Sequence, residues 1–210
     1  MLPRCRLYLI APDKIDLGVF PRTLAAALDA GDVASFLLRL EGASDDTVRR
    51  AARALMPVAH AHDVAFLIGN RPRLAAELGA DGVHLDLADA DIAGARRLLG
   101  PDRILGASGH HSRHAAIEAA EFGADYIALA ADPDLIAWWS ELMVVPCVAL
   151  GDMTTGDVTV ANGAALAAAG ADFIAADATV WDYAAGPAAA VRDFNAAIVP
   201  GESLERFMRP

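Results

Sequence analysis

The stretch GADGVHLDLADAD (residues 79–91) has two near-copies later in the chain. They are GADYIALAAD (123–132) and GADFIAADA (170–178), and AGDVASFLLRL (30–40) is a looser fourth version. In each, a glycine typical of a helix C-terminus precedes a short apolar run typical of a buried strand. The glycines are 48, 44 and 47 residues apart, at positions 31, 79, 123 and 170. This spacing fits two strand–helix units per repeat, so a further strand is expected between each pair of repeats.

The sequence supplies four further apolar runs of the kind expected for buried strands. They are CRLYLIAP (5–12), VAFLIGN (64–70), RILGAS (103–108) and PCVALGD (146–152). Helix-like segments rich in Ala and Leu follow the strands, at 21–30, 45–62, 71–79, 90–100, 112–123, 133–143, 162–170 and 186–198. Eight alternating units predict one parallel (β/α)8 TIM barrel over residues 1–200, with a C-terminal tail at 201–210. An open doubly wound sheet is the competing fold, but no Gly-x-Gly-x-x-Gly motif follows the first expected strand.

Composition and charge exclude several classes of function. The 210 residues carry a net charge of -11, with 17 basic against 28 acidic side chains, which opposes binding to nucleic acid. No apolar stretch reaches the roughly 18 residues of a membrane span, and charges appear too early for a secretory signal, so we expect a cytoplasmic protein. Cys5 and Cys147 lie in separate expected strands, which favours buried reduced thiols over a disulfide or a metal site.

Three aspartates of the repeats are expected at the amino-terminal ends of strands. They are Asp81, Asp125 and Asp172. In barrels this end serves stability, so we predict a structural and not a catalytic role for them. Functional side chains are expected on the opposite face, directly after the strands, where the sequence is polar and strongly acidic.

After the fourth expected strand, an acidic cluster could hold Mg²⁺ together with water and a substrate phosphate. Its members are His84, Asp86, Asp89 and Asp91, with Asp89 the best single ligand. The alternative is a solvated loop in which an aspartate caps the helix that begins near Asp89.

After the fifth expected strand, ASGHHSRH (107–114) brings Ser108 and His110 to the same face. His110 is a candidate general acid or base because imidazole titrates near neutral pH. The alternative is a solvated loop in which Ser112 caps the next helix.

Five stretches, taken in order, resemble the thiamine phosphate synthase family, whose relatives include thiazole tautomerases. They are LYLIAPD (7–13), the most specific segment 79–108, GADYIALA (123–130), PCVALGD (146–152) and AGADFIAADA (169–178). The resemblance implies a (β/α)8 enzyme that joins a hydroxymethylpyrimidine pyrophosphate to a thiazole phosphate. It also implies that Mg²⁺ holds the pyrophosphate leaving group.

Carried over position by position, the resemblance implies roles for particular side chains. Arg39 would clamp the pyrophosphate, Ser108 would hydrogen-bond the pyrimidine, and His110 matches a position that carries His in both branches. Mg²⁺ is implied at Asp89 and at Asn70, where an amide replaces the family's carboxylate. The implied substrate-binding residues are Asn70, Arg71, His84, Gly151 and Asp177.

The chain departs from the family pattern toward negative charge. Glu41 replaces a lysine, and Asp152 and Asp177 lie where backbone amides should receive a phosphate. Two like charges about 4 Å apart repel by roughly 4 kcal/mol at an effective dielectric near 20, which predicts a divergent phosphate site.

Three hypotheses remain open at this point. The chain is a working thiamine phosphate synthase, a tautomerase-like enzyme in which His110 moves the proton, or a non-catalytic metabolite-binding protein. A homodimer is a further expectation, because only one of the adjacent Trp138 and Trp139 can face the barrel, which leaves the other for an interface.

Overall fold

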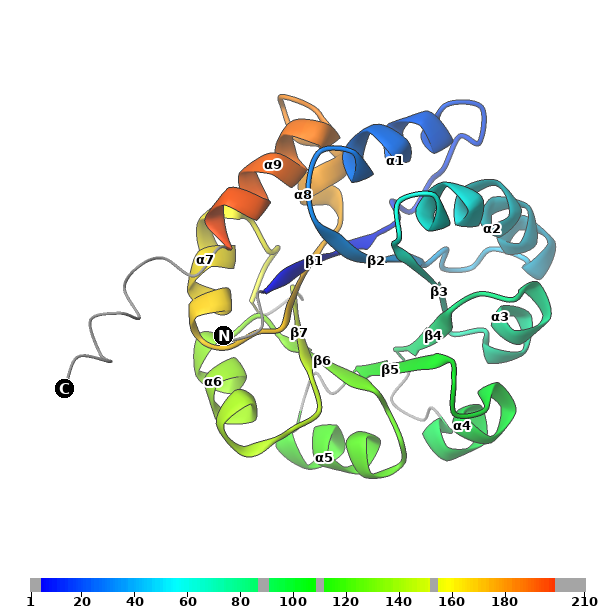
Figure 1. Ribbon diagram of the computed structural model, residues 1–210. Helices are drawn as coiled ribbons and strands as arrows, with labels where there is room; N and C mark the ends of the chain where they lie inside the picture. Colours follow the sequence, from blue (N-terminus) through cyan, green and yellow to red (C-terminus); the bar gives the residue numbers. More distant parts are fainter. Residues whose placement is uncertain (1–4, 87–90, 109–111, 152–154, 199–210) are drawn as a thin grey trace.

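A closed barrel of parallel strands forms the centre of the protein (Figure 1). The computed structural model describes residues 5–86, 91–108, 112–151 and 155–198. Each strand pairs with the next, and the last pairs with the first, so the described sheet has no free edge. The strands are β1 (Arg6–Ile10), β2 (Val33–Leu38), β3 (Ala65–Gly69), β4 (Gly82–Leu85), β5 (Ile104–Ser108), β6 (Tyr126–Ala130), β7 (Cys147–Leu150) and β8 (Phe173–Ala176). The predicted (β/α)8 barrel is confirmed.

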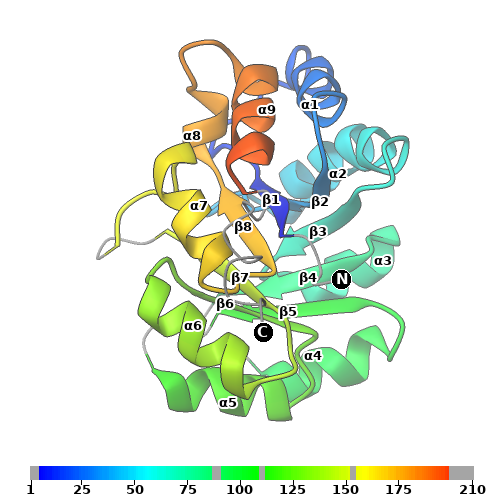
Figure 2. The same cartoon turned by 60° about the vertical axis from the view of Figure 1, so that its left-hand side comes forward.

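Helices surround the barrel on its outer side (Figures 1 and 2). They are α1 (Phe20–Leu28), α2 (Asp45–His60), α3 (Pro72–Leu78), α4 (Ile92–Leu99), α5 (Arg113–Glu121), α6 (Pro133–Leu142), α7 (Val160–Ala168), α8 (Ala178–Trp181) and α9 (Pro187–Ala197). The four-residue α8 was not predicted, because so short a segment shows no helical periodicity. The indole N–H of Trp181 in α8 donates to the carbonyl of Ile10 over 2.6 Å, which joins the end of β8 to the end of β1.

Alternation along the strands divides the core into two clusters. Side chains that point outward, such as Phe36 and Phe66, pack under the helices. Side chains that point inward fill the barrel, and they are Tyr8, Ile10, Leu37, Leu67, Tyr126, Ala128, Val148, Leu150 and Ala175. Most are aliphatic, so the two tyrosines are the unusual members of this inner cluster.

The Gly-Ala-Asp repeats connect helices to strands as their position predicted. Their glycines have φ values of +71°, +99° and +105°, a backbone region that side chains rarely adopt, at Gly79, Gly123 and Gly170. Each repeat aspartate accepts a backbone N–H near the start of the preceding strand. The bonds run from Phe66 to Asp81 (2.6 Å), from Leu105 to Asp125 (2.7 Å) and from Cys147 to Asp172 (2.8 Å).

The looser fourth repeat uses different contacts. Asp32 accepts hydrogen bonds from the guanidinium of Arg6, with Nη2 to Oδ1 at 2.7 Å, so a side chain takes the place of the strand amide. A Cβ on Gly31 would lie 2.7 Å from Nδ2 of Asn195 and 3.2 Å from Cγ1 of Val191, so close packing and not a positive φ disfavours a side chain here. The repeat whose sequence differs from Gly-Ala-Asp is therefore also the one whose aspartate has a different hydrogen-bond donor.

We expect Asp125→Ala to lower the free energy of unfolding by about 1–3 kcal/mol, because the buried end of β5 loses its acceptor. Oδ2 of Asp125 accepts both the Leu105 N–H and, at 2.5 Å, Nη2 of Arg96. Urea unfolding measures the change, with Asp102→Ala on the exposed rim as the control. Equal stability of the two variants would contradict the structural role of the repeat aspartates.

The expectation for the cysteines is confirmed, and one of the two adjacent tryptophans is buried as expected, while the homodimer stays a prediction. Cys5 and Cys147 are free and buried, and burial raises the pKa of both thiols to about 12. Trp139 is buried, whereas Trp138 is partly exposed under the guanidinium of Arg113, 4.5 Å from the ring centre. Among the residues that the structure describes, no helix is both long and apolar enough to cross a membrane.

Candidate active site

A charged pair joins the carboxyl-terminal ends of β2 and β4. Nη1 of Arg39, directly after β2, donates to Oδ2 of Asp86, directly after β4, over 3.2 Å. The side chains of Arg39 and Asp86 are 21% and 16% exposed. Glu41 lies further out, with its Oε1 3.9 Å from Nε of Arg39 and its side chain 74% exposed. The Arg39 guanidinium is therefore held at the barrel mouth by the better-shielded carboxylate.

Asn70, directly after β3, contacts the backbone of Asp86. Its φ of +55° lies in the left-handed region, which is uncommon for residues other than glycine and is tolerated best by Asn and Asp. Its Oδ1 accepts the N–H of Asp86 over 2.8 Å, and its own N–H donates to the carbonyl of His84 over 2.8 Å. Asn70 thus fixes the backbone from which Asp86 reaches Arg39. Strained backbone of this kind is often found at functional sites.

A buried chain of hydrogen bonds lies inside the barrel. His84 is 2% exposed, and its Nε2 is 3.0 Å from Oγ of Ser108 at the end of β5. Its Nδ1 is 3.0 Å from the hydroxyl of Tyr126 in β6, which is 2.8 Å from the hydroxyl of Tyr8 in β1. The chain therefore connects the inner layer of the barrel with Ser108 at the mouth, where that side chain is partly exposed.

A glycine makes room for this chain. A Cβ on Gly106 would overlap the Cζ and hydroxyl atoms of Tyr126, so only glycine fits beside this ring. The Tyr126 ring stacks on His84, with ring centres 5.7 Å apart and planes 11° apart. Burial raises the pKa of the Tyr126 and Tyr8 hydroxyls above their ordinary range, so both keep their protons near neutral pH.

Arg71 is anchored to a neighbouring loop. Its Nη2 donates to the carbonyl of Ala43 over 2.7 Å, and its Nε donates to Oδ1 of Asp45 over 3.0 Å. These bonds tie the turn after β3 to the loop before α2 and to the first residue of α2. The implied contact of Arg71 with substrate stays a prediction.

Gly151 and Asp177 follow β7 and β8 and so lie on the same face. A Cβ on Gly151 would lie 2.5 Å from the carbonyl oxygen of Gly156 and 3.0 Å from the N of Val158, so the following loop passes close over this strand end. Asp177 is partly buried and immediately precedes α8. Their roles in substrate binding also stay predictions.

The helix caps named in both alternatives are present, one with a correction, while the loops before them lie largely outside the described residues. Ser112 caps α5 by accepting the N–H of Ala115 over 3.0 Å. The helix after β4 begins at Ile92, later than expected, and Asp91 caps it by accepting the N–H of Gly94 over 2.7 Å. Asp91 therefore has a structural role.

The candidates Asp89, His110 and Asp152 lie outside the described residues. Within the described ranges, no three His, Cys, Asp or Glu side chains gather as a metal site. The expected Mg²⁺ therefore stays a prediction.

Sequence reasoning missed two tyrosines of the site and the ion pair that a third residue makes with Arg39. Tyr8 and Tyr126 were treated only as parts of apolar strands, and Asp86 was considered only as a metal ligand. The available signal was the strand alternation, which places both tyrosines on the inner face together with His84. The register between strands brings the polar atoms of these side chains together. That register cannot be predicted from any single segment of the sequence.

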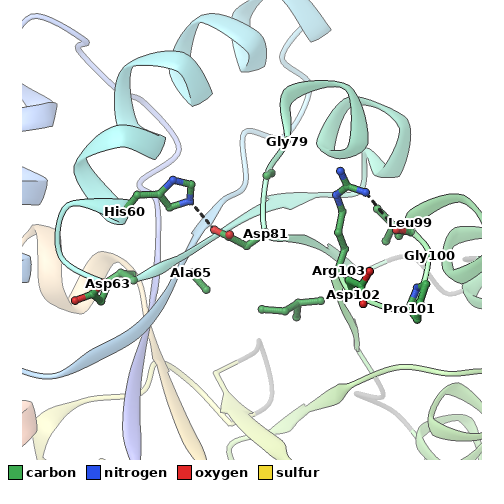
Figure 3. Close-up of a pocket in the computed structure, with 13 residues that line it drawn as sticks. His60, Asp63, Ala65, Gly79, Asp81, Leu99, Gly100, Pro101, Asp102 and Arg103 are labelled. Atoms are coloured by element: carbon green, nitrogen blue, oxygen red, sulfur yellow. Dashed lines mark hydrogen bonds and ion pairs between the residues drawn. The ribbon is translucent and has the colours of Figure 1, made fainter.

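A cavity of about 820 Å³ lies at the opposite end of the barrel. Figure 3 shows the residues that line it. It lies beside the amino-terminal ends of β3, β4 and β5, and His60, Asp81 and Arg103 contribute to its lining. Oδ2 of Asp81 already contacts Nε2 of His60 at 2.8 Å and the N–H of Phe66, so its carboxylate serves the strand ends. Barrel proteins carry their chemistry at the other face, and we assign this cavity no part in it despite its size.

The ends of β2, β3, β4 and β5 bring a guanidinium, an amide, a carboxylate and a hydroxyl to one face. These features define a (β/α)8-barrel protein with a polar small-molecule site at its carboxyl-terminal mouth. The chain belongs to the thiamine monophosphate synthase family, which matches residues 7–180.

Similar proteins support this assignment. Thiamine-phosphate synthase of Rhodospirillum centenum is 49% identical over 204 residues, which cover 91% of this chain and 96% of that protein. The protein of the same name from Hyphomonas neptunium is 43% identical over 212 residues, covering 92% and 94%. The solved structure of thiamine phosphate pyrophosphorylase from Pyrococcus furiosus has a TM-score of 0.80 at 23% identity, covering 93% of this chain and 96% of that one. This last likeness supports the fold.

Proposed function

We propose that the chain is a thiamine-phosphate synthase that joins a hydroxymethylpyrimidine pyrophosphate to a thiazole phosphate and releases pyrophosphate. The observation that carries the proposal is the 49% identity to the Rhodospirillum centenum protein of that name over 91% of this chain. The family match runs from β1 to α8 and so includes all eight strand ends.

The proposed reaction forms one bond and breaks another. The thiazole nitrogen attacks the methylene carbon on the pyrimidine, and the carbon–oxygen bond to pyrophosphate breaks. The leaving group keeps the electron pair of that bond, so nothing is oxidised or reduced. Negative charge grows on the leaving oxygen in the transition state, and a fixed cation beside it lowers the barrier.

Arg39 is the side chain suited to receive the pyrophosphate. A guanidinium matches phosphate oxygens with two parallel N–H donors, and Asp86 holds this one in a single orientation. Pre-orientation matters because little of the binding energy is then used to order the side chain. In the same proposal, the hydroxyl of Ser108 hydrogen-bonds the pyrimidine, and Gly151 and Asp177 border the thiazole phosphate.

Mg²⁺ belongs to the proposal as the counter-ion of the pyrophosphate. When bound, the ion would neutralise charge on the leaving phosphate oxygens. Mg²⁺ takes hard oxygen ligands, usually one or two carboxylates with water and substrate phosphate. The amide oxygen of Asn70, next to the backbone of Asp86, and the carboxylate of Asp89 three residues further along are donors of this type. We assign the ion to Asn70 and Asp89, while Asp86 orients Arg39.

Glu41 at the mouth is compatible with an anionic substrate in this proposal. Glu41 is mostly exposed and lies beside a guanidinium, so water and Arg39 screen its repulsion of phosphate to about 1 kcal/mol or less. This is a small effect beside the roughly 4 kcal/mol that an unscreened clash would cost.

The test is product formation from the two purified substrates in the presence of Mg²⁺. We expect thiamine phosphate and pyrophosphate to appear in equal amounts, and Asp89→Ala to remove most of the turnover. Asp102→Ala is the control, because it removes a carboxylate at the opposite end of the barrel. Its turnover rate should equal that of the unchanged protein.

Two results would overturn the proposal in favour of another reading. Isomerisation of a thiazole substrate without joining, lost in His110→Ala, would indicate a tautomerase-like enzyme. Calorimetric binding of the pyrimidine or thiazole compound with no turnover of either would indicate a metabolite-binding protein.

A further inference from the structure

We propose that Tyr126 and Tyr8 are positioning residues, which hold His84 in its Nε2–H tautomer and thereby make Ser108 a hydrogen-bond donor to the substrate. The first part concerns the protein alone. The second part rests on the proposed function, because it needs the pyrimidine to lie at Ser108.

Four groups among the described residues form a continuous chain of polar atoms. Its contacts are Tyr8 hydroxyl to Tyr126 hydroxyl (2.8 Å), Tyr126 hydroxyl to His84 Nδ1 (3.0 Å) and His84 Nε2 to Ser108 Oγ (3.0 Å). Tyr8, Tyr126 and His84 are 4%, 6% and 2% exposed, so these contacts are shielded from water. Each hydroxyl carries one proton and a neutral imidazole carries one, so the direction of one bond sets the direction of the others.

With a neutral imidazole, only two arrangements of the protons satisfy all three contacts. In the first, Tyr8 donates to Tyr126, Tyr126 donates to Nδ1, and the Nε2–H of His84 donates to Ser108. In the second, every bond is reversed: Ser108 donates to Nε2, Nδ1–H donates to Tyr126, and Tyr126 donates to Tyr8.

The two arrangements differ in which proton is left over. The first leaves the proton of Ser108, which is partly exposed at the mouth and can be donated to a ligand. The second leaves the proton of Tyr8, which is buried, and Tyr126 is the hydrogen-bond partner that the described residues give it. The adjoining cavity, of about 260 Å³, is lined mainly by apolar side chains such as Leu67, Val148 and Phe173. Its polar lining residues Arg6, Ser35 and Asp125 make no hydrogen bond to Tyr8 among the contacts of the described residues. Leaving one buried donor unsatisfied disfavours a state by about 5- to 150-fold, which selects the first arrangement.

The surroundings keep this arrangement in place. Burial raises the pKa of both tyrosines, so each remains an O–H group throughout the pH range of an assay. The space left by Gly106 and the stacking of His84 on Tyr126 fix both rings. A serine that already accepts an N–H can turn its own hydrogen toward the mouth, so the buried pair determines what Ser108 offers a ligand.

The tautomer can be measured without substrate. In protein labelled with ¹⁵N-histidine, nitrogen chemical shifts at about pH 8, where imidazole is ordinarily neutral, distinguish Nε2–H from Nδ1–H. The His84 signal is identified by its loss in His84→Gln. We expect the Nε2–H form in the unchanged protein and a shift toward a mixture in Tyr126→Phe. Tyr183→Phe is the matched control, because this hydroxyl donates to Asp193 on the surface, and it should change nothing.

Kinetics test the second part. We expect Tyr126→Phe to raise KM for the pyrimidine pyrophosphate about 10-fold with a smaller change in kcat, because the lost contact is present before the transition state. Tyr8→Phe should have a smaller effect in the same direction, since Tyr126 can still donate to Nδ1. In a His84→Gln background, whose amide N–H replaces Nε2–H, Tyr126→Phe should have no further effect on KM.

The outcomes separate this inference from the proposed function. A predominant Nδ1–H tautomer in the unchanged protein would overturn the inference even if the protein is an active synthase. An inactive protein with the Nε2–H tautomer, and the shift in Tyr126→Phe, would overturn the proposed function and leave the first part intact. An unchanged KM in a folded Tyr126→Phe protein would overturn the second part.

Discussion

Replacing Arg39 by methionine is expected to lower kcat for thiamine phosphate formation by about 10²- to 10³-fold, the usual cost of losing one fixed group that stabilises developing charge. Methionine keeps most of the aliphatic length and removes only the guanidinium. The effect should fall mainly on kcat, because Arg39 gains strength as negative charge grows on the leaving pyrophosphate. Steady-state release of pyrophosphate measures it.

Arg97→Met is the matched control for this change. Arg97 is 74% exposed in α4, with its Nη2 3.9 Å from Oδ2 of Asp91, and exposed pairs at such distances contribute little. We expect its kcat to remain within about twofold of the unchanged protein. If Arg39→Met also stays in that range while the protein is active, Arg39 does not hold the pyrophosphate.

The second large effect is expected on stability. Gly106→Ala should lower the free energy of unfolding by about 1–3 kcal/mol, because the added methyl overlaps the ring of Tyr126 inside a packed barrel. The ring cannot move away freely, since its hydroxyl contacts both Tyr8 and His84. Urea unfolding at constant slope measures the loss.

Gly163→Ala provides the comparison. This glycine lies within α7, and a Cβ there would meet its nearest neighbour at 3.6 Å, an ordinary contact. Alanine is also the better helix former by up to about 1 kcal/mol. We expect this variant to be as stable as the unchanged protein or slightly more so. A Gly106→Ala variant that is equally stable would mean that Tyr126 is not confined as the structure shows.

The barrel could be predicted from the sequence because its repeating connection is local. Gly79, Gly123 and Gly170 each end a helix with a positive φ, and the following aspartate meets the amide of the strand before it. These contacts recur at similar spacings of 44 and 47 residues, so the repeat itself indicated the number of units. The start of α4 was misplaced because several aspartates precede it, and only the contact from Asp91 to Gly94 shows which of them is the cap.

The candidate site could be predicted only as a set of positions. Arg39, Asn70, His84 and Ser108 were identified because they follow or end apolar runs, which places them on one face of a barrel. Their partners depend on register across the sheet. Arg39 and Asp86 are 47 residues apart, and Tyr8 and Tyr126 are 118 apart, so no local pattern joins them. Arg71 shows that a position on the correct face does not reveal the partner of its side chain. The guanidinium of Arg71 binds Ala43 and Asp45, which the sequence pattern did not indicate.

A crystal structure of the protein with the pyrimidine pyrophosphate and Mg²⁺ tests the assignment of the site most directly. We expect the pyrophosphate to contact the guanidinium of Arg39, with Oγ of Ser108 within about 3 Å of a pyrimidine nitrogen. A substrate bound elsewhere, for instance in the cavity of His60 and Arg103 at the amino-terminal end, would contradict it.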